Sequence, residues 1–204
     1  MTGCSSRTGY NGVMRPFLRL ASLFSSFAAI LLLAACGGES SIKPSEVLDE
    51  RTGMTVGTLD KPIELMQGTP ASLASDRRSS YAYLGPVEWD KMGNIRYGLW
   101  IHVAPGTDWR FDPIKAPGTV SLSLDAAAMP LSPIEPPALA RAPYQPVASW
   151  GETAYFGVDL ELLRRMAASG SIGLDVKAGG SVVHFSAAPD AHETLLRYLH
   201  ARGY

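Results

Sequence analysis

Short runs in which apolar and polar residues alternate recur through the middle of the chain. A period of two is the spacing of β-strands with one face in a core, because successive side chains point to opposite sides of the sheet. The runs at 53–59 and 63–66 are separated by Asp60-Lys61-Pro62, which predicts a turn between two strands. The run 119–124 predicts another strand, and residues 171–187 predict a hairpin with a Gly-Gly pair at its turn.

The clearest hairpin joins residues 81–90 to residues 95–103 through the tetrapeptide KMGN. Its Gly-Asn pair suits a tight turn, and a loop of two or four residues keeps the same parity across the two strands. One face of the hairpin is then aliphatic, with Leu84 and the odd-numbered residues of the second strand. The other face is aromatic and also carries an arginine and a histidine. Its candidate binding residues are Tyr81, Tyr83, Trp89, Arg96, Trp100 and His102.

This aromatic face has two interpretations. As an exposed platform it would bind a glycan, a peptide or a protein, because aromatic rings provide a large contact area at a small entropic cost. As part of the core it would be covered by the C-terminal helices, whose Leu195 and Leu199 need an apolar surface. We favour the second interpretation and expect Trp89 and Trp100 to be buried.

Two segments of the C-terminal third have helical spacing. The first runs from Asp159, which can cap the helix, to about Ser169. The second opens at Pro189 and ends at Gly203. In this second helix we expect three leucines to point inward, namely Leu195, Leu196 and Leu199.

Residues 104–149 contain nine of the chain's 15 prolines. Within this segment, residues 129–146 lack helix or strand character and are expected to run as an extended surface loop. Residues 67–80 also predict a loop. The order of strands, helix, hairpin and helix predicts a mostly β (α+β) fold, either an antiparallel β-sandwich or a curved sheet. Two short helices in the C-terminal half would pack on it.

The N-terminal residues follow a different pattern. Arg15 and Arg19 precede an uncharged run from Leu20 to Ala35. As a helix rising ~1.5 Å per residue, this run would be roughly 24 Å long, shorter than the roughly 30 Å core of a bilayer. A basic start, a short apolar run and small residues at its end describe a secretory signal peptide over residues 1–35. Residues 1–13 fit no part of this leader, so Met14 is an alternative start.

The apolar run ends in Leu33-Ala34-Ala35-Cys36, which resembles the lipobox of bacterial lipoprotein precursors. The resemblance implies that the Cys36 thiol receives a diacylglycerol, that cleavage falls between Ala35 and Cys36, and that the new amine is then acylated. Each buried CH₂ contributes roughly 0.8 kcal/mol and a single chain binds only marginally, so two or three chains on one cysteine would make a lasting anchor. The alternatives are an ordinary secretory signal with a chance cysteine, or a single-span anchor.

The residue after the cysteine bears on which membrane the anchor enters. In the lipoprotein family, an aspartate at this position tends to retain the protein in the inner membrane. Here the residue is Gly37, so the resemblance favours the periplasmic face of the outer membrane over the inner membrane. The chain as a whole resembles small proteobacterial envelope lipoproteins, a resemblance that assigns no activity.

Composition sets further bounds on the chain that follows the leader. Without residues 1–35 it carries 15 basic and 19 acidic residues, a net charge of −4 without a basic block, which argues against nucleic acid as a partner. Cys36 is then the only cysteine, so a structural disulfide is excluded. Residues 36–47 are small and polar and predict a flexible tether, followed by a single globular periplasmic domain over 48–204.

The sequence offers little catalytic chemistry. HETLL at 192–196 begins like the zinc-protease motif H-E-x-x-H, but Leu196 stands where the second histidine is needed. The chain contains no G-x-S-x-G and no phosphate-binding glycine motif. We therefore predict no catalytic residues, no metal site and no cofactor. Two function classes remain: a lipid-anchored envelope protein that binds a protein or cell-wall component, and a lipid-anchored hydrolase whose site the sequence does not reveal.

Overall fold

The computed structural model describes residues 42–68, 80–106 and 110–204, all within the unit Ser41–Tyr204. The predicted signal peptide (1–35), the lipid-attachment residue Cys36, the first half of the tether and most of the predicted loop 67–80 lie outside the described residues.

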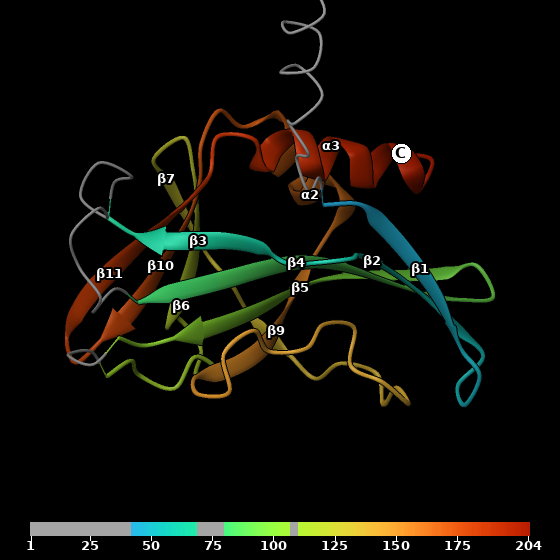
Figure 1. Cartoon of the computed structure of the whole chain (residues 1–204), viewed down its shortest axis with the longest axis horizontal. Helices are drawn as coiled ribbons and strands as arrows, with labels where there is room; N and C mark the ends of the chain where they lie inside the picture. Colours follow the sequence, from blue (N-terminus) through green and yellow to red (C-terminus); the bar gives the residue numbers. More distant parts are fainter. Residues whose placement is uncertain (1–41, 69–79, 107–109) are drawn as a thin grey trace, which may run out of the picture. The chain divides into compact units, whose positions relative to one another are not determined.

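The described residues form one curled antiparallel sheet, half of a barrel, with two short helices from the C-terminal half (Figure 1). This confirms the predicted mostly β class and selects the curved sheet over the sandwich. The first strands are β1 (Pro44–Asp49), β2 (Met54–Leu59), β3 (Ile63–Gln67), β4 (Tyr81–Lys91), β5 (Asn94–Ala104) and β6 (Val120–Leu124). They are followed by β7 (Ala127–Pro130), β8 (Pro133–Ile134), β9 (Glu152–Val158), β10 (Ile172–Ala178) and β11 (Ser181–Ala187). The helices are α2 (Leu160–Ala168) and α3 (Ala191–Ala201).

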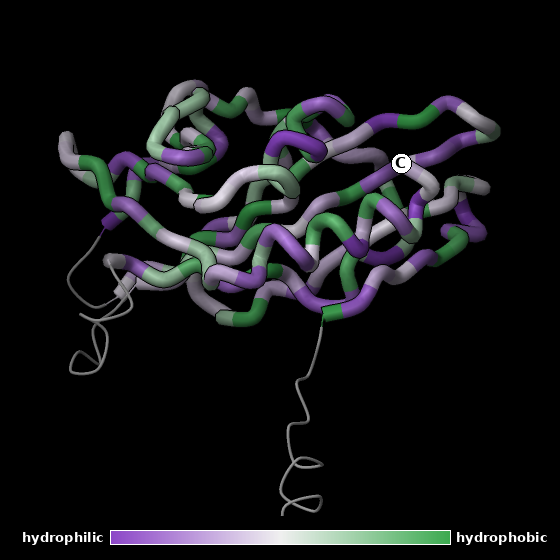
Figure 2. The backbone as a smooth tube through the Cα atoms, turned by 90° about the horizontal axis from the view of Figure 1, so that it is seen from above, coloured by the Kyte–Doolittle hydropathy of each residue, from purple (hydrophilic) through white to green (hydrophobic). Residues whose placement is uncertain are grey.

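The strand order is β7-β6-β10-β11-β3-β4-β5-β9-β8. The strand β4 pairs with β5 along its whole length, while its other edge is shared by β3 and β2. The strand β1 extends the sheet beyond β2. Apolar and polar residues alternate along the strands, as the tube coloured by hydropathy shows (Figure 2). No helix in the described residues is long and apolar enough to span a membrane.

The turn of the β4–β5 hairpin has two residues, Met92 and Gly93, both with positive φ. The carboxylate of Asp90 accepts a hydrogen bond from the Gly93 amide at 2.7 Å and supports this conformation. Because the loop has an even number of residues, Tyr83 pairs with His102 and Trp89 pairs with Arg96. The predicted division into an aliphatic face and an aromatic face is therefore confirmed.

The helices cover the aliphatic face, not the aromatic one. The Tyr198 hydroxyl of α3 donates a hydrogen bond to the Gly57 carbonyl at 3.4 Å. Arg202, the residue after α3, donates a hydrogen bond to the Glu88 carboxylate. Gly57 pairs with Glu88, whose side chain is on the face opposite Trp89. Leu195 and Leu199 are buried as predicted, but Leu196 is exposed, so its predicted inward position is wrong.

The aromatic face is covered by the proline-rich segment, which passes along the side of the sheet opposite the helices (Figure 1). Tyr144 of this segment is buried; its hydroxyl accepts a hydrogen bond from the Leu59 amide at 2.8 Å and donates to the Pro86 carbonyl at 2.9 Å. Its ring lies over Gly85, where a Cβ would come within 2.4 Å of ring atoms. The prediction of a surface loop over 129–146 is therefore wrong for Tyr144, and the segment also contributes to β7 and forms β8.

The domain begins earlier than the sequence suggested. Residues 44–47, assigned to the tether, belong to β1 and pair with β2. Glu46 forms an ion pair with Arg202, and the Lys43 carbonyl accepts a hydrogen bond from the Asp60 amide at 2.7 Å. A domain boundary at Leu48 would therefore cut β1 in half, and Ile42, the first described residue, already packs against the core.

Candidate functional site

The six residues of the predicted binding surface do not form an exposed platform. Trp89 and Trp100 are each 1% exposed and His102 is 2% exposed, which confirms that both tryptophans are buried. At the end of the face, Tyr83 is partly buried and Tyr81 is 37% exposed. Arg96 is exposed beside the hairpin turn.

The buried part of this face is a stack of rings. The ring of Trp100 is centred 5.2 Å from that of Tyr144 and 5.9 Å from the imidazole of His102, with an interplanar angle of 20° to the imidazole. Trp89 packs beside Tyr155 of β9, with ring centroids 6.0 Å apart, and it extends over Gly98, where a Cβ would approach it to 2.7 Å. This face is a second layer of the core.

His102 is a buried side chain that contacts β9. Its Nδ1 lies 2.9 Å from the Thr153 hydroxyl. Burial lowers the pKa of the imidazole below its ordinary value, because a charged ring would lose its hydration. Within the described part of the chain, its Nε2 has no hydrogen-bond partner.

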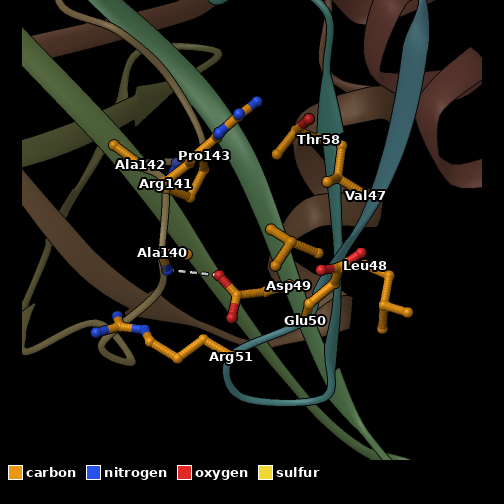
Figure 3. Close-up of a pocket in the computed structure, with 11 residues that line it drawn as sticks. Val47, Leu48, Asp49, Glu50, Arg51, Thr58, Ala140, Arg141, Ala142 and Pro143 are labelled. Carbon is orange, nitrogen blue, oxygen red and sulfur yellow. Dashed lines mark hydrogen bonds between the residues drawn. The ribbon is translucent and has the colours of Figure 1, made fainter.

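A cavity of about 630 Å³ lies at the edge of this same face (Figure 3). Its floor is formed by Val47 of β1 with Val56 and Thr58 of β2, and Val56 pairs in turn with Trp89. Its opposite wall is the segment Ala140–Pro143, which leads into the buried Tyr144. The β1–β2 turn, with Glu50 and Arg51, closes one end.

Asp49 and Arg51 hold the two walls of the cavity together. One oxygen of Asp49 accepts a hydrogen bond from the Ala140 amide at 2.5 Å (Figure 3). The other oxygen accepts bonds from the Thr52 amide and hydroxyl at 2.9 and 2.8 Å. The bond from Ala140 is the main cause of the lowered pKa of Asp49, because it favours the charged carboxylate. Arg51 donates to the Ala138 carbonyl at 2.5 Å.

The lining of this cavity is mixed in polarity. Asp49 accepts three hydrogen bonds from amide and hydroxyl donors, and the other charged lining residues, Glu50, Arg51 and Arg141, bring the total charge of the lining to zero. The lining contains no serine, cysteine or histidine that could act as a nucleophile or a base. Among the residues that the structure describes, no group of three or more His, Cys, Asp or Glu side chains could hold a metal ion.

A second group of polar side chains lies on β6, β10 and β11. The Nδ1 of His184 in β11 is 2.6 Å from the Oδ1 of Asp175 in β10. The imidazole extends over Gly173, where a Cβ would come within 2.7 Å of Cε1. Gly173 is paired with Ser123 on one side and Ser186 on the other. All five residues line an open cavity of about 460 Å³, so an Asp–His pair has hydroxyl groups nearby.

No known protein family, curated protein or solved structure matches this chain. The geometry of its own residues therefore has to carry any functional conclusion.

Sequence reasoning missed the first cavity because its walls come from distant parts of the chain. Asp49 and Ala140 are 91 positions apart and lie in segments that were interpreted as the start of the domain and as a surface loop. The signal that was available was local: an aspartate can accept a hydrogen bond from a backbone amide of the turn that follows it, as Asp49 does from Thr52.

Proposed function

We propose that this protein is a lipid-anchored envelope lipoprotein with a non-catalytic binding role, held by acylated Cys36 on the periplasmic face of the outer membrane. The observation that supports the binding role is the cavity between the β1–β2 hairpin and Ala140–Pro143. It is concave, mixed in polarity, neutral in total charge and lined by no serine, cysteine or histidine. Its ligand would be an envelope protein or a cell-wall component. The net charge of −4 outside the leader argues against nucleic acid.

The anchor is tested by Cys36→Ser in the native host. The serine hydroxyl cannot replace the thiol that receives the diacylglycerol, so the variant should accumulate as an unprocessed and unacylated precursor. Mass spectrometry of the protein after membrane fractionation measures both changes. Normal cleavage after Ala35, with normal membrane fractionation, would rule out the lipobox interpretation.

The binding role is tested by capturing partners of the native acylated protein from solubilised envelopes. Ala142 is exposed and lines the cavity, so Ala142→Trp should fill it and remove a partner that the wild type retains. Ala116→Trp is the matched control, because Ala116 is exposed in the loop before β6 and lines neither cavity. A binding role at the cavity is contradicted if Ala142→Trp captures the same proteins as the control.

The second candidate is a lipid-anchored hydrolase, which the Asp175–His184 pair favours. Aspartate, histidine and a serine hydroxyl form the machinery of acyl transfer when the histidine can take the serine proton. Ser123 and Ser186 are the neighbouring hydroxyls, and neither is hydrogen-bonded to the imidazole. A fluorophosphonate reagent should leave the wild-type protein unlabelled. If the wild-type protein is labelled and Ser123→Ala or Ser186→Ala loses the label, the hydrolase is the correct function and the binding role is not.

A further inference from the structure

The strand β1 has one open edge. It pairs with β2 on one side, and no other described strand pairs with it. Its central residues are exposed, including two apolar side chains, Val47 at 58% and Leu48 at 61%. An open edge presents unpaired backbone amides and carbonyls, and the chemistry that complements such a row is another extended polypeptide.

The direction of these backbone groups follows from two hydrogen bonds. The Asp60 amide donates to the Lys43 carbonyl, whereas the Leu59 amide points away from β1 and donates to the Tyr144 hydroxyl. Antiparallel ladders alternate between pairs that exchange hydrogen bonds and pairs that do not. Glu46 and Leu48 therefore direct their backbone groups toward the open edge, while those of Val47 point to β2.

The other two terminal strands of the sheet are less suitable for pairing. The strand β7 has four residues and ends in Pro130, and β8 has two residues and begins with Pro133. Short edges and prolines are the features that prevent strand addition. The strand β1 has six residues, and its only proline, Pro44, is the first of them. Its charged residue Glu46 is turned onto the helix-covered face, where it pairs with Arg202.

The 630 Å³ cavity lies over the face of the sheet beside this open edge, with Val56 and Thr58 of β2 also in its floor. Its lining includes the consecutive residues Val47 to Arg51, so it runs along the backbone of β1 into the turn (Figure 3). The lining contains apolar side chains, among them Val47, Val56 and Pro143. Its two acidic and two basic residues give it a total charge of zero. A neutral apolar side chain of an added strand would fit this lining better than a charged one.

We propose that an extended segment of another polypeptide adds to the open edge of β1 as a further strand and places an apolar side chain in the cavity beside it. This proposal rests on the binding role proposed above and specifies its ligand as a peptide strand. Main-chain hydrogen bonds to Glu46 and Leu48 supply the affinity, and the cavity supplies the preference for one side chain.

The test uses a random dodecapeptide library displayed on phage, selected against the full processed chain in detergent micelles. Enriched peptides should alternate apolar and polar residues and lack internal proline. Leu48→Pro removes the outward amide without removing a bond to β2, and Leu48→Ala is the control that loses the side chain but keeps the amide. We expect Leu48→Pro to weaken peptide binding about fivefold to tenfold relative to Leu48→Ala, as for one lost backbone hydrogen bond.

Hydrogen exchange of the wild-type amides provides a measurement that does not depend on any variant folding. Peptide binding should slow the exchange of the Glu46 and Leu48 amides, while the Val47 amide, already bonded to β2, should change little. Failure to enrich any peptide, or protection elsewhere in the chain, overturns strand addition at β1. If no peptide binds but Ala142→Trp still loses a partner that the wild type captures, the binding role stands. Only the peptide ligand is then refuted.

Discussion

Replacing Arg202 by alanine should lower the free energy of unfolding by about 3–5 kcal/mol, the usual cost of removing one partner of a buried ion pair. The Arg202 side chain is only 11% exposed, and it donates to the Oε1 of Glu88 from Nη2 at 2.5 Å and from Nε at 3.2 Å. The Glu88 side chain is almost fully buried, and its second oxygen has no partner in the described residues. The truncated variant would therefore leave a buried carboxylate without its cation.

The geometry around Arg202 explains why the effect should extend to β1. Glu46, Gly57 and Glu88 are paired in one row across β1, β2 and β4. The guanidinium lies over Gly57, where a Cβ would come within 2.8 Å of Nε, and it reaches both carboxylates. The hydrogen bond to Glu88 is the largest cause of the raised pKa of Arg202, because it favours the charged guanidinium.

Chemical denaturation measured by circular dichroism checks this prediction. Arg197→Ala is the control, because Arg197 is on the exposed side of the same helix and should change stability by less than about 0.5 kcal/mol. The double variant Glu88→Gln/Arg202→Ala should be less destabilised than the two single effects combined, since the buried charge is then absent. A loss below about 1 kcal/mol in Arg202→Ala would show that Glu88 finds water or another donor.

Replacing Trp100 by alanine should also cost about 3–5 kcal/mol, as for other buried aromatic side chains. Trp100 lies between His102 on its own strand and Tyr144 of the covering segment. Its removal would leave a cavity and take away the ring on which Tyr144 packs. Thermal and urea unfolding measure the loss.

Trp150→Ala is a matched control for Trp100→Ala, because Trp150 is 63% exposed and belongs to the segment that follows Tyr144. The control should change stability by less than about 0.5 kcal/mol. If Trp100→Ala behaved like the control and only weakened partner capture, the aromatic face would have to be accessible to ligands in solution.

Local sequence patterns predicted the strands and helices of this fold better than they predicted which segment packs on which face of the sheet. The even-length turn within KMGN and the alternation around it determine which side chains share a face of the hairpin, and both were readable, although the turn residues are Met92-Gly93 and not the expected Gly-Asn pair. The spacing of Leu195 and Leu199 shows that one side of α3 is buried, but it does not show which face of a sheet receives that side. The helices were therefore assigned to the wrong face.

The elements that sequence reasoning missed depend on contacts between distant positions. The residues Pro44–Val47 have the composition of a tether, and they are held in the sheet by pairing with β2 and by Arg202, 156 positions after Glu46. Tyr144 belongs to no periodic segment, and its burial depends on two backbone partners in β2 and β4. The cavity depends on both, so its lining could not be assembled from local patterns.

The ion pair between Glu46 and Arg202 links the first strand of the domain to its last residues. During synthesis β1 is made first, whereas the guanidinium that fastens it is among the last groups to become available. Contacts between such distant positions carry a large loop-closure entropy and slow folding. The β1–β2 pairing can form early because the two strands are neighbours in sequence, whereas the ion pair that joins β1 to the chain after α3 can form only late, and loss of Arg202 would remove that late contact while leaving the pairing in place.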